Sequence, residues 1–182
     1  MDKFCQWDSW MSCSQILRAN NLVVESGFAK TANFSGMNFV IIKNIIQIIA
    51  DFYAEYKFLK PIGFVGNGLI HNPAFVKGDS TILGWVEAVE ENECVPVSAY
   101  ALCFVPKHIS DINFLIFHEM CHVIDSNFRM GISSSPEMQN MFGADAEELL
   151  ADAYAEYKTS LNPSETAIAV GNFIKNFCRK GK

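Results

Sequence analysis

Two histidines and a glutamate near the middle of the chain have the spacing of a metal site that carries its own base. His118 and His122 are four residues apart, and Glu119 directly follows the first of them. On an α-helix, residues i and i+4 lie on one face, so both imidazoles can reach a single ion. The carboxylate of Glu119 points about 100° around the helix axis, beside a water on the ion rather than at the ion itself. This layout suits hydrolytic zinc chemistry, in which some residues hold the metal and another moves a proton.

The segment that carries these residues is predicted to be a helix. Ser110 and Asp111 are good candidates for its N-cap, and neither Pro nor Gly lies between them and the motif. Apolar residues recur at helical spacing and predict a buried face: Phe114, Phe117, Cys121, Ile124 and Phe128. His118, His122 and Asp125 fall together on another face, which makes Asp125 a candidate for an outer partner of the site. The alternative is an amphipathic helix whose two histidines bind no metal.

A zinc site needs a third protein ligand, and no histidine follows His122. The strong helix formers over residues 143–157 offer carboxylates instead. One face of this second helix consists of Glu148, Ala151, Asp152 and Ala155. Because its two alanines permit close packing, we expect Glu148 to ligate the metal and Asp152 to accept the free N–H of a ligating histidine. Glu147 is the neighbouring candidate, and the whole acidic run can also be a first turn favoured by the helix dipole.

These motifs resemble those of the gluzincin metallopeptidases, in which HExxH is followed by a glutamate ligand on a later helix. The spacing from Glu148 to Asp152 is similar to that of the CaaX prenyl-protease and HtpX-type peptidases. The segments from His122 to Asp125 and from Ala153 to Ala155 resemble the lethal factor-like peptidases. Together the motifs span residues 110–158. The subfamily is left open by Met141, which stands where the lethal factor-like group tends to carry a tyrosine.

The resemblance implies a zinc-dependent endopeptidase with a minimal zincin-like fold. Zn²⁺ would be bound by His118, His122 and Glu148, and Glu119 would serve as general base and then pass the proton to the leaving amine. The substrate would be a protein or peptide. Two alternatives are a zinc-stabilised binding or regulatory domain without peptidase activity, and a hydrolase of a non-peptide amide or ester.

The sequence offers several groups that could assist the metal and hold the substrate. A second donor to the oxyanion is expected, and the candidates are Tyr154, Tyr157, Tyr100, Arg129, His71 and His108. The resemblance places a strand before the motif helix at the rim of the cleft, where Ser98 and Tyr100 could pair with an extended peptide. Its alternative is a central strand. The connection over residues 129–142 is long for a loop and is predicted to be a mobile wall of the cleft, or plain surface.

Composition limits the remaining function classes. The 182 residues predict one domain, residues 1–182, and the net charge of −6 argues against a nucleic-acid partner. The first residues do not have the pattern of a secretory signal, so none is expected, and the scattered cysteines fit reduced thiols. A cytoplasmic location is therefore expected, with export by a non-classical route left open. No membrane span is expected, since the apolar run over residues 39–49 is short and contains Lys43 and Gln47. The oligomeric state is not indicated.

The predicted fold class is α+β, with a small, mostly antiparallel sheet packed against helices. Residues 1–35 are poorly defined beyond a short helix that ends near Leu17. The further elements are a long helix over 37–59, strands over 61–65, 81–89 and 97–105, the motif helix, the ligand helix over 143–157, and a last helix opened by Asn162 and Pro163.

Overall fold

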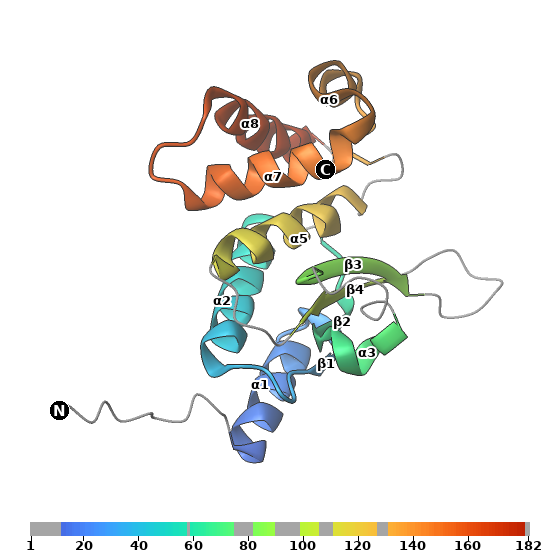
Figure 1. Ribbon diagram of the computed structural model, residues 1–182, viewed down its shortest axis with the longest axis vertical. Coiled ribbons are helices and arrows are strands. Elements are labelled where there is room, and N and C mark those ends of the chain that lie inside the picture. Colours follow the sequence, from blue (N-terminus) through green and yellow to red (C-terminus); the bar gives the residue numbers. More distant parts are fainter. Residues whose placement is uncertain are drawn as a thin grey trace.

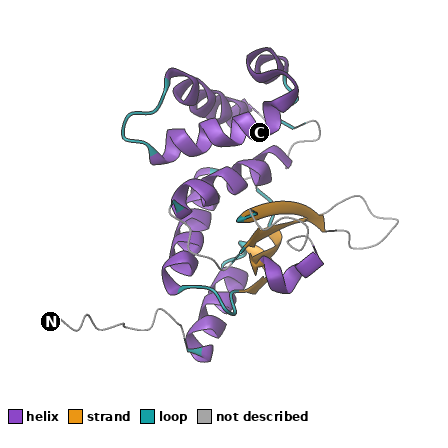
Figure 2. Ribbon diagram, in the orientation of Figure 1, coloured by secondary structure: helices purple, strands orange, loops and turns teal. Residues whose placement is uncertain are grey.

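The computed structural model describes residues 12–57, 59–74, 82–89, 99–105, 111–126 and 131–180 (Figure 1). Its helices are α1 (Cys13–Glu25), α2 (Phe39–Glu55), α3 (Gly68–His71), α5 (Ile112–Ser126), α6 (Pro136–Phe142), α7 (Ala146–Thr159) and α8 (Glu165–Lys180). Its strands are β1 (Ala29–Asn33), β2 (Ile62–Asn67), β3 (Gly84–Val89) and β4 (Ala99–Phe104). Helices gather around one small sheet (Figure 2), which confirms the predicted mixture of helices and strands.

The sheet is mixed, and the prediction of a mostly antiparallel sheet is wrong. Its order is β1-β2-β4-β3. The β1–β2 and β2–β4 pairs are parallel, and only β3 and β4 form an antiparallel pair. The strand that was not predicted, β1, lies in the stretch that had no clear pattern. Parallel strands need a long crossover connection, and α2 supplies it between β1 and β2.

The strand that leads toward the motif helix is central, so the prediction that it offers a free edge to a peptide is wrong. Strand β4 is paired on both sides, with Phe104 opposite Asn67 of β2 and opposite Gly84 of β3. Tyr100 lies opposite Ala88 of β3. Ser98, the other residue proposed for substrate pairing, lies outside the described residues. Within the described sheet, β3 is instead the outer strand on this side.

The main hydrophobic core lies on the face of the sheet that α2 and α5 cover. Helix α2 begins at Asn38, whose side chain accepts a hydrogen bond from the Val40 N–H. Its buried side chains meet residues of the sheet and of α5, α7 and α8 in one cluster. The central members are Ile42, Ile45, Ile49, Phe52, Val65, Leu102, Phe104, Ile116, Met120 and Leu150. No helix in the described part of the chain has both the length and the apolar character to cross a membrane.

A second, smaller core lies on the opposite face of the sheet. It consists of Trp85, Ala101, Cys103 and Val105, with Phe64 packed against it. Helix α3 starts at Asn67, whose side chain accepts a hydrogen bond from the Leu69 N–H. The indole of Trp85 presses on this helix so closely that a Cβ on Gly68 would lie 2.1 Å from the ring. Glycine at position 68 therefore allows α3 to seat against β3.

Three helices differ from the prediction, and each begins at a serine cap. Helix α1 extends to Glu25 from a capping box between Ser12 and Gln15. Helix α8 is capped by Ser164, whose Oγ accepts from the Ala167 N–H, and not by the Asn162–Pro163 pair. Helix α6 is capped by Ser135 with a proline in its first turn. The segment predicted as a long loop over 129–142 is therefore half helical.

Candidate metal centre

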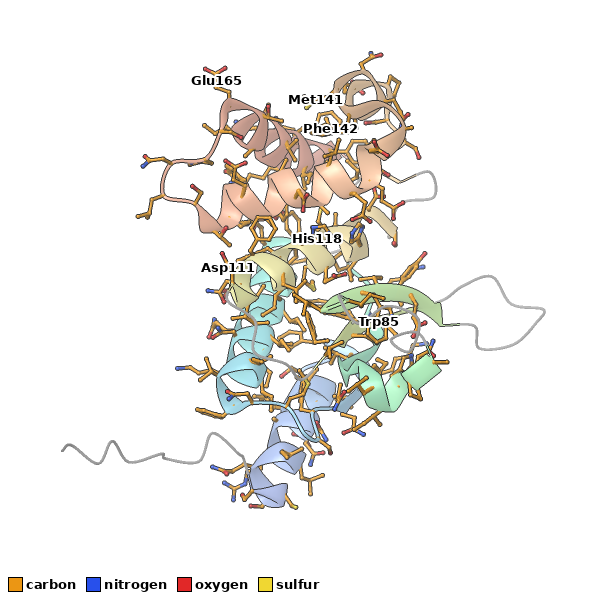
Figure 3. All side chains as sticks on the ribbon, viewed as in Figure 1. Trp85, Asp111, His118, Met141, Phe142 and Glu165 are labelled. Carbon is orange, nitrogen blue, oxygen red and sulfur yellow. The ribbon has the colours of Figure 1, made fainter. Side chains whose placement is uncertain are left out.

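Helix α5 directs the two motif histidines toward α7. Its N-terminus is capped by Asp111, whose Oδ1 accepts from the Phe114 N–H at 3.0 Å, which confirms one of the two predicted caps. The opposite face of α5 is buried in the main core through residues that include Ile116 and Met120. Figure 3 shows His118 between α5 and α7. The histidines are thus fixed by a helix that is itself anchored in the core.

Both histidines and Glu148 converge on one point. The two Nε2 atoms are 3.1 Å apart. The carboxylate of Glu148 reaches both, with 3.4 Å from its Oε2 to His118 Nε2 and 3.6 Å from its Oε1 to His122 Nε2. One ligand atom from each residue lies within 4.8 Å of the other two, so the three can hold a metal ion.

The predicted outer residues of α7 take different positions around this group. Asp152 Oδ1 lies 2.9 Å from His118 Nδ1, the ring nitrogen that faces away from the convergence point. This contact fixes the orientation of the imidazole and favours its metal-binding tautomer. Glu147 reaches only His122 Nδ1, at 3.6 Å. Of the two neighbouring glutamates, Glu148 is the one brought to both Nε2 atoms.

Close packing between α5 and α7 makes this convergence possible. Ala151 and Ala155 are both fully buried, as expected for the alanine face of the ligand helix. Larger side chains there would hold the two helices farther apart, because interaxial distance depends on the side chains at the contact. The alanines therefore set the distance over which Glu148 must reach.

Asp125 holds the chain after α5 rather than a histidine. Its carboxylate accepts hydrogen bonds from the Ile132 N–H, from the Ser133 N–H at 2.8 Å and from the Ser133 Oγ at 2.7 Å. Gly131, with φ +69°, lets the backbone turn close beneath it: a Cβ there would be 3.1 Å from Oδ2. The residue predicted as an outer partner of the site thus fixes the start of the connection to α6.

The side chain of Glu119 is buried beside the histidines, with only 5% of the residue exposed. It packs over Gly84 of β3, where a Cβ would lie 3.2 Å from Glu119 Oε1. Burial raises the pKa of Glu119 to about 8, and the nearby Glu148 carboxylate contributes to the shift. In the metal-free protein this group therefore holds a proton at neutral pH.

The pKa of His122 is lowered, whereas that of Glu119 is raised. Burial lowers its pKa, and the charge of His118 lowers it further, against the smaller raising effects of Glu148, Glu147 and Asp125. A neutral imidazole presents the nitrogen lone pair that a metal requires. The lowered pKa therefore favours the neutral form of the His122 ring, which is the form that can bind a metal ion.

The candidate ligands and Glu119 line a cleft of about 460 Å³ between α5, α7 and the β3–β4 pair. Tyr100 also lines it and is the tyrosine that the described structure places there. Tyr154 does not, since it is fully buried and its hydroxyl lies 2.9 Å from that of Tyr56. Tyr157 faces α8, where its hydroxyl accepts a hydrogen bond from Lys175 Nζ at 2.7 Å. Arg129 and His108 lie outside the described residues.

The raised pKa of Glu119 has a measurable effect on stability. The unfolded chain loses this proton near the ordinary pKa, but the folded metal-free chain keeps it to about pH 8. The folded state therefore binds more protons over this range and loses stability as pH rises from about 5 to about 8. We expect metal-free Glu119→Gln to be more stable than the parent chain by up to about 4 kcal/mol at the upper end, and much less at the lower. Urea unfolding of both chelated proteins at the two pH values measures this, and an equal difference at both would contradict it.

Sequence reasoning missed two features of the cleft. Strand β3 forms one wall through Gly84 and Val86, although no motif marks it. The signal available in the sequence was the alternation along this strand, in which successive side chains point to opposite faces of the sheet and so toward the two cores. The proximity of Gly84 to Glu119 depends on tertiary packing alone.

A scan against family models, a search of curated proteins and a search of solved structures each find no match to this chain.

Proposed function

We propose that the protein is a zinc-dependent peptidase of the gluzincin type. The observation that carries the proposal is the convergence of His118 Nε2, His122 Nε2 and the Glu148 carboxylate. These residues come from two helices and line the cleft, so an ion bound by them would keep a coordination position for water. Three protein ligands with an open position are typical of catalytic rather than structural zinc sites.

The donor set fits a divalent cation. Two imidazole nitrogens at 3.1 Å face each other beside a carboxylate, and Glu119 adds a second carboxylate next to them. Without a cation these carboxylates repel each other, as the influence of Glu148 on the pKa of Glu119 indicates. Imidazole and carboxylate ligands in this combination are those that zinc accepts in hydrolases. When bound, zinc would supply a Lewis acid that acidifies water and polarises a carbonyl group.

The protein's own residues then divide the work. Glu119 accepts a proton from the attacking water on its carboxylate and donates it to the nitrogen of the leaving amine. Asp152 keeps the His118 ring in place through Nδ1. Tyr100, which lines the cleft, is the described candidate for a hydroxyl that donates to the oxyanion.

Strand β3 is the best candidate to hold the substrate. It pairs with β4 on one side only, within the described sheet, and it lines the cleft through Gly84, Trp85 and Val86. An extended peptide could add to this edge through main-chain hydrogen bonds, with alternate side chains directed toward the cleft. The absence of a side chain on Gly84 lets the Glu119 side chain pack directly against this strand, since a Cβ there would lie 3.2 Å from Glu119 Oε1.

A defined peptide library tests the function. We expect the zinc-loaded protein to cleave a subset of peptides, chelation to stop cleavage, and added zinc to restore it. Zinc binding without cleavage of any peptide would favour a zinc-stabilised binding domain instead. Cleavage of simple amides or esters but not peptides would favour a non-peptide hydrolase.

A further inference from the structure

A second group of ligand-type side chains lies on the opposite face of the sheet from α5. His71 ends α3, Glu87 is on β3 and Cys103 is on β4. One ligand atom from each lies within 4.8 Å of the other two. The three residues are 16 or more positions apart along the chain, so no sequence motif announces the group.

The carboxylate of Glu87 is oriented but incompletely bonded. Its Oε2 accepts a hydrogen bond from Asn72 Nδ2 at 3.0 Å. Its Oε1 is buried and has no hydrogen-bond partner among the described residues, even though His71 Nε2 lies 3.1 Å away. Ligand atoms around a tetrahedral zinc are separated by about 3.2–3.8 Å, as bond lengths of about 2.0–2.3 Å require. The Nε2 to Oε1 spacing of 3.1 Å is slightly below this range, so the two part-exposed side chains would need to separate only slightly to bind one ion.

The surroundings hold the other two ligands in position. The His71 ring stacks on Phe64, with centroids 4.3 Å apart and planes 15° apart. Cys103 is fully buried in the small core beside Trp85, so its sulfur has little freedom to move. His71 and Glu87 have side chains 26% and 23% exposed, which leaves a path by which an ion could enter.

We infer that His71, Glu87 and Cys103 form a second metal site, distinct from the cleft and selective for a thiolate-binding ion such as Zn²⁺. Imidazole, carboxylate and thiolate together favour zinc over Mg²⁺ or Ca²⁺, which prefer oxygen ligands alone. The ion would join α3 to the β3–β4 pair and would stabilise this part of the fold. The inference does not depend on the proposed peptidase activity, because it uses none of the residues of the cleft.

Cobalt is a suitable probe because, of the two candidate sites among the described residues, only this one includes a cysteine. A thiolate bound to Co²⁺ gives a near-ultraviolet charge-transfer absorption that imidazole and carboxylate ligands do not give. We expect the full-length protein titrated with Co²⁺ to develop this band, with saturation at about one thiolate-bound ion per chain. Cys103→Ser should abolish the band, and His71→Ala should raise the Co²⁺ concentration needed for it by at least about tenfold.

Two controls separate the site from other thiols and from the cleft. Cys178→Ser removes another buried cysteine, far along the chain in α8, and should leave the band unchanged. Glu148→Gln alters the cleft and should leave it unchanged as well. Absence of the band at excess Co²⁺, or its persistence in Cys103→Ser, overturns the inference. If Cys103→Ser fails to fold, the part-exposed His71→Ala decides, and an unchanged titration of that variant overturns the inference equally.

Discussion

Glu119→Gln should abolish turnover while leaving the metal in place. The glutamine is nearly the same size as glutamate, so the packing against Gly84 is preserved. It cannot accept the proton of the attacking water or return it to the leaving amine. Loss of a general base of this kind costs about 10²–10⁴-fold in kcat. We expect zinc content, measured by elemental analysis, to stay at the parent level and peptide cleavage to fall by at least that factor.

The matched control for this variant is Glu147→Gln, which removes a carboxylate from the rim of the same cleft. Among the described ring nitrogens of the two histidines, Glu147 approaches Nδ1 of His122 and neither Nε2 atom, so its loss should change kcat far less than the loss of Glu119. Equal losses in the two variants would show that the cleft needs negative charge in general rather than a base at position 119. Retention of full activity in Glu119→Gln would contradict the proposed mechanism.

Glu148→Gln should weaken zinc binding itself. The side chain of Glu148 approaches both Nε2 atoms, and an amide is a far poorer zinc ligand than a carboxylate. We expect the zinc affinity, measured by competition with a chromogenic chelator, to fall by more than about 100-fold, beyond the loss typical of outer partners. Peptide cleavage should fall in parallel and recover partly at high zinc concentration.

The neighbouring glutamate is again the natural comparison. Glu147 and Glu148 have side chains that are 68% and 70% exposed, so the two glutamine variants perturb the surface to a similar extent. Only the variant at 148 should lose zinc. A larger loss in Glu147→Gln would mean that the third ligand is Glu147 and that α7 is rotated in the loaded protein.

The parts of the site that could be predicted from the sequence are those that helical geometry determines alone. His118 and His122 share a face because they are four residues apart, whatever surrounds them. Glu148 and Asp152 could be predicted for the same reason, together with the small residues that let α7 approach α5. Their arrangement needs one helix-to-helix contact and no further knowledge of the topology.

The same helical geometry explains why Tyr154 and Tyr157, predicted as candidates for the oxyanion donor, do not face the cleft. Tyr154 is six residues after Glu148 and Tyr157 is nine, which places them about 240° and 180° around the helix from the ligand. The structure accordingly directs Tyr154 to the core and Tyr157 to α8. The helical spacing alone therefore places both tyrosines away from Glu148, and only their residue type made them candidates for the oxyanion donor.

The strand predictions failed where long-range pairing decides. Strand β1 has the sequence AKTAN, which has little of the β-branched and aromatic character expected of a strand. It forms because α2 returns the chain to a parallel partner, β2. The position of β4 in the middle of the sheet follows from that pairing, and local pattern cannot show it.

The contacts between α2 and α7 limit how far this protein can be cut down. The hydroxyls of Tyr56 and Tyr154 meet in the core, and Phe52 packs edge-on against the Tyr154 ring. At the surface, Lys158 Nζ and Glu55 Oε2 join the same two helices at 2.6 Å. The stretch from His118 to Glu148 contains every proposed ligand of the cleft, yet the back of its second helix is built by residues 52–56. A fragment that begins after β2 would therefore keep all the proposed ligands of the cleft but lose residues 52–56, which pack against α7 and hold it in position.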